Sequence, residues 1–498
     1  MLHPRRVAGS VGAITRLFSL TFLLPALAAW FYDANRLTTS LVFVSCAGGV
    51  YLLGAALERL GDGSNDLGNR EAYLSVGLGW ILLCLLAAVP FVVTGTLRNP
   101  VDALFETMSG LTTTGASVIP VLEEVDPSVH VWRATLQFLG GMGIIVLSVA
   151  VLSRLSQGGL QMLQAEVPGP TFHRSTPRLI HAVRTLWRLY LGIAATFFVA
   201  MLGLLMGRHN MGLKEAIYES LIHTFATVST GGFSNHSESI AFFHDPIVEL
   251  LVIGGMLIAG TNFALLLLVK QGHWRRLVQD AEWRLYAGNF MLVTMAITLV
   301  LMRAGAGFLE ALRDSGFVVA SMMTSTGFAT ADYNVWPAAT HLLILFIMVG
   351  GGMASSTSGG VKLARILLLL KAVGRHFRTL LHPRAVLPLR MNGKVVQDRT
   401  LMTAAAFFIS FLGLWLLGTL ALELTDPAFR DATAAASASL SALSNIGPGL
   451  GVVGPTENFA DLSVGSKLVL AAEMWFGRLE IFTAVLVFLP ETWRNYRN

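Results

Sequence analysis

The sequence predicts an all-α polytopic membrane protein, with four similar repeats around one pore and an additional pair of membrane helices at the N-terminus. The first observation behind this prediction is composition. Of the 498 residues, 54% are hydrophobic and 13% are charged, whereas soluble globular proteins have about 25% charged residues. The second observation is a series of long apolar stretches, and the third is a glycine-centred motif that occurs four times.

The apolar stretches approach or exceed the roughly 20 residues that a helix needs to cross a bilayer. They lie near residues 14–33, 39–57, 74–95, 135–152, 189–207, 247–269, 290–302, 401–422 and 467–489. Only a tight polar turn separates the first two, so we expect a retained helical hairpin rather than a cleaved signal peptide. Cys46 and Cys84 lie in apolar stretches, which predicts buried thiols and no disulfide.

The distribution of charge predicts the orientation of these helices. Segments 153–188, 270–285 and 371–400 together hold 16 Lys and Arg but 4 Asp and Glu, whereas segments 96–128, 208–247, 303–341 and 423–467 hold 7 basic and 17 acidic residues. By the positive-inside rule, the first set is cytoplasmic. An acidic outer face attracts cations, although acids also remain outside simply because basic residues collect inside. The basic residues thus indicate topology, and no nucleic-acid partner is expected.

One short motif recurs at four places on the predicted outer side. It reads LTTTGAS (111–117), VSTGGFS (228–234), TSTGFAT (324–330) and SNIGPGL (444–450). Its reference glycines are Gly115, Gly232, Gly327 and Gly447. Thirteen residues before them stand Asp102, Glu219, Asp314 and Ala434, and in the fourth copy Asp431 lies about one helical turn earlier. This matched spacing indicates an internal repeat.

Each motif follows a short stretch that we expect to be helical. The first begins with Asn99 as N-cap and Pro100 at the first helical position, and Asp426 and Pro427 repeat this pattern before the fourth motif. About a dozen helical residues span roughly 18 Å, which is only part of a bilayer. The predicted unit is therefore a helix, a short re-entrant helix, an extended glycine strand and a second helix.

Non-helical backbone at membrane depth is tolerated only where protein or a water-filled cavity satisfies it. Four strands around one axis meet this condition, because glycine lets successive carbonyls point inward and replace the hydration shell of an ion. The negative C-terminal ends of the short helices favour a cation. One such segment alone is typical of a helix cap, but four at matched spacing favour a cation filter. Hydroxyls add ligands or brace the strands at Thr113, Thr114, Thr230, Ser325 and Thr326.

The segment GGGMASSTSGGVK (350–362) interrupts the last helix of the third repeat. Five glycines in thirteen residues make a poor helix, since each costs about 1 kcal/mol relative to alanine. The residues alone predict an intramembrane hinge that lines a cavity below the filter. The alternative is a glycine-rich packing seam between helices, which is also how we interpret GGMG (140–143).

Arg478 lies inside the last apolar stretch, where a charge costs about 2.5–3.5 kcal/mol on insertion scales and marks a pathway or a pair. Two hypotheses follow, a barrier to cations in the pore and a structural ion pair with Glu473 or Glu480. Lys362 either lines the cavity or extends toward the cytoplasm. His223 precedes the second motif, and we expect a hydrogen-bonded helix residue there rather than a proton site.

These motifs resemble the filter motifs of the Trk/Ktr/HKT superfamily of potassium transporters, and most closely those of TrkH-type membrane subunits of bacterial Trk systems. The resemblance runs from about residue 66 to the end, and the hairpin at about 12–60 is similar to one that TrkH-type proteins have and Ktr-type proteins lack. It implies an N-terminal transmembrane hairpin followed by four pore repeats. Their bounds are 1–65 for the hairpin and 66–160, 161–272, 273–385 and 386–498 for the repeats.

The resemblance implies that carbonyls of the motifs bind potassium. The implied filter residues are Thr113, Thr114, Gly115, Thr230, Gly231, Gly232, Ser325, Thr326, Gly327, Asn445, Ile446 and Gly447. In the family, serine at the first filter glycine goes with sodium transport, so glycine in all four repeats is expected to select potassium. Pro448 departs from Phe233 and Phe328 at the next position, which implies a stiffer fourth strand and a pore that is only roughly fourfold.

The resemblance also makes residues 350–362 a gate that obstructs the pore and that Arg478 contacts. The implied gate residues are Gly350, Gly351, Gly352, Ser355, Ser356, Thr357, Gly359, Gly360, Lys362 and Arg478. It further implies a homodimer in the bacterial inner (cytoplasmic) membrane with one pore per protomer and both termini cytoplasmic. Cytosolic TrkA-like regulatory subunits would dock beneath it and would hold the only nucleotide, while this chain has no cofactor and transports K⁺.

The predicted function is potassium uptake through a gated filter, and the alternative is a proton- or sodium-coupled potassium symporter. A carrier needs intramembrane carboxylates, whereas the acids here cluster at outer helix ends. Glu423 and Glu473, near helix ends or within spans, leave proton coupling open. An intramembrane enzyme would need a nucleophile and a base, but the cluster Ser355, Ser356 and Ser358 has no evident basic partner. No enzymatic activity is expected.

Overall fold

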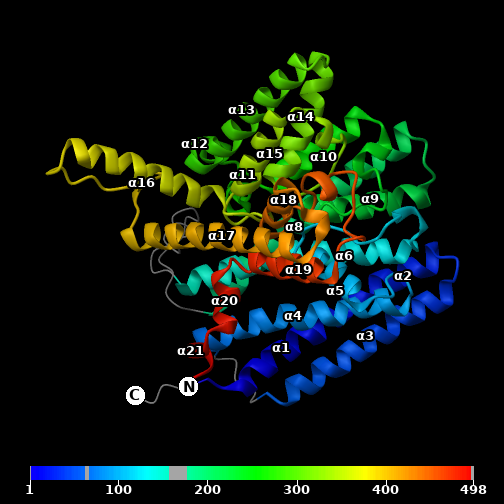
Figure 1. Cartoon of the computed structure of the whole chain (residues 1–498). Coiled ribbons are helices and arrows are strands. Elements are labelled where there is room, and N and C mark those ends of the chain that lie inside the picture. Colours follow the sequence, from blue (N-terminus) through cyan, green and yellow to red (C-terminus); the bar gives the residue numbers. More distant parts are fainter. Residues whose placement is uncertain (1, 62–66, 156–175, 495–498) are drawn as a thin grey trace.

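The computed structural model describes residues 2–61, 67–155 and 176–494 and is almost entirely helical (Figure 1). In this part of the chain six helices are long and apolar enough to cross a membrane, and the count rises to seven if one bent pair forms a single span. The strands that the described residues form, β1 (Arg390–Met391) and β2 (Lys394–Val395), make one small antiparallel hairpin. The predicted all-α class is therefore confirmed, while the expected domain limits at 65/66 and 160/161 lie outside the described residues.

The N-terminal hairpin packs beside the first repeat (Figure 1). Its first membrane span runs from Pro4 to Tyr32, which is longer than the apolar stretch alone predicted. The span consists of α1 (Pro4–Phe18), a 3₁₀ turn η1 (Ser19–Phe22) and α2 (Leu23–Tyr32), and α3 (Arg36–Arg59) returns. The turn at its far end is tied to the first repeat, because Asp33 accepts hydrogen bonds from the backbone and side chain of Ser128 at 3.0 and 2.6 Å.

Each repeat begins with a long helix and continues with a shorter, re-entrant one. The long helices are α4 (Asn69–Val93), α8 (Thr176–Arg208), α13 (Ala281–Arg303) and α17 (Asp398–Thr425). The re-entrant helices are α5 (Pro100–Leu111), α9 (Leu213–Val228), α14 (Phe308–Met323) and α18 (Ala432–Ser444). The latter have 12 to 16 residues and span about 18–24 Å, so they cross only part of a bilayer.

The starts of the re-entrant helices agree with the sequence prediction in one case and correct it in another. Asn99 caps α5, and its side chain accepts the Val101 amide at 3.0 Å. The expected helix start at Asp426 is wrong, because Asp426 caps only a 3₁₀ turn, η5 (Pro427–Phe429). Asp431 caps α18 instead. Two short polar side chains with free acceptors stand five residues apart here, and each begins its own turn.

The second helices of three repeats are broken, whereas α6 (Pro127–Leu155) of the first repeat is continuous. The broken helices are α10 (Pro246–Ala259) with α11 (Phe263–Lys270), α15 (Ala338–Gly350) with α16 (Leu363–Leu381), and α19 (Val464–Arg478) with α20 (Phe482–Phe488). The continuous spans predicted at 247–269 and 467–489 are therefore wrong. The first contains a bend of 105°, where Asn262 caps α11 by accepting the Ala264 amide, and the second is interrupted before Ile481, whose φ is 49°.

The remaining elements are short and connect these helices. They are α12 (Trp274–Gln279), α21 (Pro490–Trp493) and the 3₁₀ turns η2 (Leu122–Glu124), η3 (Ser239–Phe243), η4 (Tyr333–Val335) and η6 (Gly451–Val453). Figure 1 shows α16 projecting away from the body of the molecule, together with the β hairpin that follows it.

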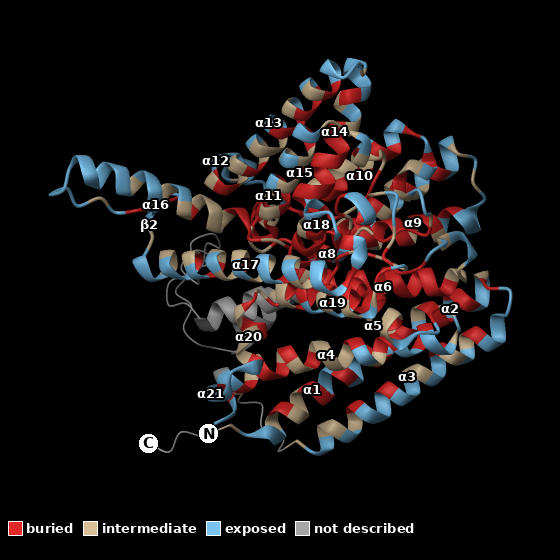
Figure 2. Cartoon of the chain, in the orientation of Figure 1, coloured by how far each residue is buried: buried red, intermediate tan, exposed pale blue. Residues whose placement is uncertain are grey.

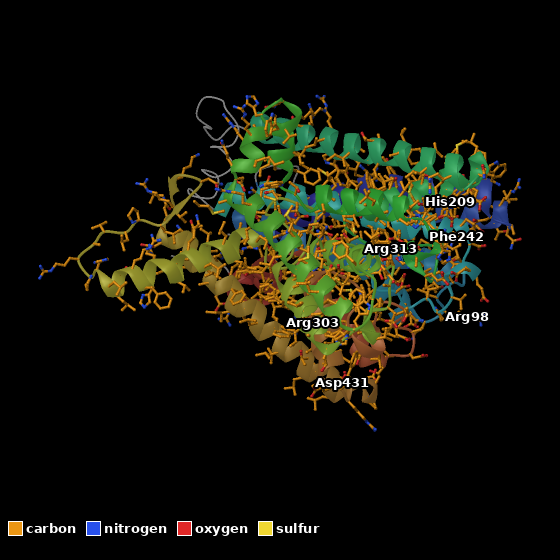
Figure 3. All side chains as sticks on the ribbon, turned by 90° about the horizontal axis from the view of Figure 1, so that it is seen from above. Arg98, His209, Phe242, Arg303, Arg313 and Asp431 are labelled. Carbon is orange, nitrogen blue, oxygen red and sulfur yellow. The ribbon has the colours of Figure 1, made fainter. Side chains whose placement is uncertain are left out.

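The four repeats face the same way. Arg98, His209, Arg303 and Asp431 lie in or beside the four connections between long and re-entrant helices. Figure 3 shows Arg98 and His209 at the end opposite α16, and Arg303 and Asp431 nearer the middle. Burial is deepest at the centre of the molecule, where the re-entrant helices meet (Figure 2). The polar ends of these helices are therefore enclosed by the other helices.

Candidate functional site

All four re-entrant helices end in the same backbone motif. The residue two positions before each reference glycine has a left-handed conformation with φ between 52° and 55°. These residues are Thr113, Thr230, Ser325 and Asn445. The amide that follows each one donates to the carbonyl five residues earlier at 2.8 to 2.9 Å, which is a Schellman closure. Left-handed threonine is uncommon, and such backbone strain tends to occur at functional sites.

The four reference glycines form a closed ring around one axis. Their φ angles are 86° at Gly115, 76° at Gly232, 85° at Gly327 and 110° at Gly447. A Cβ added to each would collide with a backbone carbonyl oxygen of the next repeat. The distances would be 2.3 Å from Gly115 to Gly231, 1.9 Å from Gly232 to Thr326, 1.9 Å from Gly327 to Ile446 and 2.7 Å from Gly447 to Thr114. Only glycine fits this ring, because both the φ angle and the packing exclude a side chain.

Side chains brace the strands of the ring. The Asn445 amide donates to the Thr114 hydroxyl at 3.1 Å and so joins the fourth repeat to the first. Gln137 of α6, in the first repeat, reaches the strand of the second repeat. It donates to the Gly231 carbonyl at 2.5 Å and accepts the Phe233 amide at 3.1 Å. The Thr113 hydroxyl is buried without a hydrogen-bond partner among the described residues. Most of these polar groups therefore brace the strands rather than point at an empty space.

A buried ion pair fastens two of the strands that form the ring. Arg133 of α6 and Glu106 of α5 are both about fully buried, with 2.8 Å between Nε and Oε1. Arg133 also donates to the Ser234 carbonyl at 2.8 Å and to the Ser117 hydroxyl at 3.2 Å, and its guanidinium lies 4.0 Å from the Phe233 ring centre. One side chain thus joins the strand after Gly115 to the strand after Gly232.

A cavity of about 120 Å³ opens above the ring, and all four strands line it. Gly115, Gly232, Gly327 and Pro448 contribute to its lining. Pro448 also packs against the third strand, because a Cβ on Gly327 would lie 2.9 Å from its ring. The fourth strand keeps the left-handed pattern despite the proline, but its glycine has the largest φ and the widest gap in the ring.

The segment between α15 and α16, residues 351–362, lies directly beneath the ring and is mostly buried. Its Thr357 hydroxyl donates to the Val228 carbonyl at 3.3 Å and to the Ala259 carbonyl at 3.1 Å. Its Gly359 amide donates to the Ser325 hydroxyl at 2.5 Å, and Gly359 approaches the Ser444 carbonyl so closely that it has no room for a side chain. The segment therefore contacts the second, third and fourth repeats.

Arg478, the last residue of α19, is 1% exposed and reaches this segment. It donates to the Thr357 carbonyl and to the Gly140 carbonyl of α6, each at 2.8 Å. The ion-pair hypothesis is not met in the described residues, because Glu480 pairs with Arg365 at 2.5 Å and Glu473 accepts the Ser439 hydroxyl at 2.6 Å. The guanidinium therefore joins this segment to the first repeat.

Three other residues that the sequence analysis named have defined contacts in the structure. Lys362 is 7% exposed and its ammonium donates to the Ser358 carbonyl, so it does not extend toward the cytoplasm. His223 is fully buried, and its Nδ1 lies 2.9 Å from the Glu219 carbonyl, which agrees with the expected hydrogen-bonded helix residue. Gly140 of the GGMG segment packs against the Leu111 carbonyl, which agrees with the expected close packing.

The acids that precede the motifs are partnered rather than open to ions. Asp102 pairs with Lys467 at 2.7 Å and Asp314 with Arg313 at 3.2 Å. Glu219 lies 3.1 Å from His236 and accepts an amide proton from Asn235. Their recurrence thus reflects ion pairs and hydrogen bonds that fasten the re-entrant helices.

Sequence reasoning missed Glu106, Arg133 and Gln137. Two of them are charges separated by 27 positions, in a re-entrant helix and in the membrane helix that follows. Charged residues inside apolar helices are costly and are usually paired. The signal that could have revealed Glu106 and Arg133 was therefore the presence of opposite charges at similar depth within one repeat. The contact of Gln137 with the second strand crosses repeats, and no local pattern predicts it.

The family model for TrkH, described as a cation transport protein, matches residues 51–302 and 289–494. The Trk system potassium uptake protein TrkH of Salmonella typhimurium is 34% identical over 505 residues, which cover 99% of this chain and 100% of that protein. The protein TrkG of Escherichia coli K12, with the same system name, is 33% identical and covers 99% of each chain.

Among solved structures, the crystal structure of the potassium transporter TrkH from Vibrio parahaemolyticus is similar to this chain with a TM-score of 0.88. Its sequence is 32% identical, and the match covers 99% of this chain and 100% of that chain. The fold, from the hairpin to the last helix, is thus shared over the whole length.

Proposed function

The chain belongs to the TrkH family of cation transport proteins, and from this premise we propose that it takes up potassium through the ring of four glycines. It is a membrane transport protein and not an enzyme. The observation that carries the proposal is the closed ring, in which each glycine abuts a carbonyl of the next repeat. Backbone oxygens gathered in this way can replace the hydration shell of a potassium ion.

The proposed ligands are carbonyls of the residues around the four glycines, as the family resemblance implied. Among them the Gly231 carbonyl already accepts a hydrogen bond from Gln137, so its share in ion binding should be weaker than that of its counterparts at Thr114, Thr326 and Ile446. The re-entrant helices direct their negative ends toward the same centre, which favours a cation over an anion.

The proposed gate is the segment 350–362 together with Arg478. Its burial under the ring and its bonds to Val228, Ser325 and Arg478 support an obstructing position. The arginine adds a positive charge below the ring, which opposes the passage of a cation until the segment moves. The proposed assembly is a homodimer in the bacterial cytoplasmic membrane with both termini cytoplasmic, regulated by TrkA-like nucleotide-binding subunits on the side where α16 projects.

Ion flux into vesicles that hold the purified chain tests this function. We expect potassium and rubidium to enter much faster than sodium, and Gly115→Ser to lose this preference, because the serine Cβ collides with the Gly231 carbonyl. Gly413→Ser is the matched control, since that exposed glycine of α17 has no atom within 4 Å of an added Cβ. Equal sodium and potassium flux through the unaltered chain would contradict the potassium filter.

A proton- or sodium-coupled symporter is the second candidate, and Glu473 favours the proton-coupled form. This residue of α19 is 5% exposed, and its Oε2 has no hydrogen-bond partner among the described residues. A carboxyl in such a place can carry a proton. The symporter requires that potassium flux stops without a proton or sodium gradient and that Glu473→Gln abolishes the proton dependence, whereas the channel function predicts downhill flux without either gradient.

A further inference from the structure

One carboxylate holds both ends of the segment beneath the ring. Glu282 stands in the first turn of α13 and is 5% exposed. Its Oε1 accepts the Ala354 amide at 2.6 Å and the Ala364 amide at 3.0 Å. Ala354 lies near the start of the segment, and Ala364 is the second residue of α16, just beyond its end. A single oxygen therefore ties together the two points between which the segment must move.

The β hairpin is fixed to the same end of α13. Asn392, in the turn between β1 and β2, donates to Asp280 Oδ2 at 2.6 Å and accepts the Ala281 amide at 2.9 Å. Asp280 is the N-cap of α13 and accepts the Trp283 amide with its other oxygen. The hairpin is therefore hydrogen-bonded to the N-terminus of α13, where Asp280 stands two residues before Glu282.

The hairpin is also fixed to α16, the helix that begins where the segment ends. Lys371 of α16 donates to the Arg390 carbonyl at 3.0 Å. Leu389 and Met391 bury their side chains against Leu368 of α16. The hairpin therefore bridges the two helices whose separation sets the Glu282–Ala364 distance.

We propose that Glu282 is a positioning residue that latches the segment 351–362 closed, and that the hairpin 390–395 is the handle through which a cytoplasmic partner releases it. This inference rests on the proposed function, in which the segment is the gate. The ionised carboxylate is favoured by the α13 N-terminus, and hydrogen bonds to a charged acceptor are the strong ones. Pulling the hairpin away from α13 moves α16 with it and lengthens the bond from Ala364 to Glu282.

Rubidium flux into vesicles through the chain without any partner tests the latch. We expect Glu282→Ala to raise basal flux about tenfold or more, because two partly buried donors lose a charged acceptor. Glu282→Gln should stay within about threefold of the unaltered chain, since an amide oxygen still accepts both bonds. This rescue separates positioning from general damage. Glu249→Ala is the control, because that buried acid in the first turn of α10 faces Arg313 and should leave flux unchanged.

A second variant keeps the test valid if Glu282→Ala does not fold. Ala364→Pro removes one of the two donors without altering Glu282, and proline is tolerated in the first turn of a helix. It should also raise basal flux. Asn392→Ala removes the two hydrogen bonds between the hairpin and α13. It should raise basal flux less than Glu282→Ala does. Basal flux unchanged in folded Glu282→Ala, or in Ala364→Pro, overturns the latch, and Asn392→Ala without effect overturns the handle.

Deletion of residues 355–358 distinguishes failure of the latch from failure of the gate. If the deletion raises flux and Glu282→Ala does not, the segment obstructs the pore but Glu282 does not hold it. If the deletion leaves flux unchanged, the gate itself is refuted, and the latch with it.

Discussion

Alanine placed at the ring glycines, one at a time, should impair potassium selectivity in a fixed order. The loss should be greatest for Gly232→Ala and Gly327→Ala, smaller for Gly115→Ala and smallest for Gly447→Ala. The order follows the distance from the added Cβ to the carbonyl oxygen of the next repeat, which is 1.9, 1.9, 2.3 and 2.7 Å respectively. The shorter this distance, the further the neighbouring strand must move.

Two costs set the magnitude. The first is common to all four positions, because a left-handed φ costs an L-residue roughly 1–2 kcal/mol, which corresponds to a factor of about 5–30 in an equilibrium. The second is graded. To reach 3.0 Å, the carbonyl must retreat by about 1.1 Å at Gly232 and Gly327 but by about 0.3 Å at Gly447. We expect the potassium-to-sodium flux ratio to fall by about 5- to 30-fold in Gly447→Ala. In Gly232→Ala we expect the preference for potassium over sodium to disappear.

The assay is parallel uptake of labelled rubidium and sodium into vesicles with matched protein content. Gly413→Ala is the control that adds the same methyl group at an open position. Size-exclusion profiles establish that each variant is folded. A Gly232→Ala variant with the unaltered flux ratio, or a Gly447→Ala variant that is more impaired than Gly232→Ala, would refute the inference that the ring selects the ion.

Three further outcomes are expected. Arg133→Leu should destabilise the protein by about 3–5 kcal/mol, because it leaves the Glu106 carboxylate buried without its ion-pair partner. Thermal unfolding in detergent measures this loss. The double variant Arg133→Leu/Glu106→Leu should recover stability, which is the control. Arg478→Ala should raise basal rubidium flux through loss of its two carbonyl bonds, and unchanged flux would contradict its place in the gate. The Arg208 guanidinium beside Asp245 holds the pKa of that carboxyl below its usual value. The stability that this ion pair adds is therefore present above about pH 4 and is lost as pH falls through the lowered pKa of the folded state. The decline of melting temperature at acid pH should be shallower in Asp245→Asn.

The glycine ring was predictable from sequence because its cause is local and repeated. A glycine is needed wherever φ is positive and the next strand is close, so four copies of one motif at matched spacing from Asp102, Glu219 and Asp314 reported one shared geometry. The α5 cap at Asn99 was predictable for the same reason, since a cap needs only the residues beside it.

The bends in the second helices were not predictable in the same way. Residues 247–269 are almost uniformly apolar, and hydropathy reports the length of such a stretch but not its direction. The change of direction depends on Asn262 turning back to cap α11 and on Gly260 fitting against Tyr286. The cap is local, but the fit of Gly260 against Tyr286 is a tertiary contact that the sequence pattern does not show. The same holds for Glu282, whose partners at Ala354 and Ala364 are more than 70 positions away.

The segment beneath the ring is tied to all four repeats, to the first of them through Arg478. Its Thr357 is held by the second repeat and by Arg478 of the fourth, its Gly359 by Ser325 of the third, and Arg478 extends the contact to Gly140 of the first. A segment tied in this way has no half-detached position that keeps most of its bonds. Recordings from single molecules should therefore show two current levels with no intermediate, and the fourfold pore should behave as a binary switch.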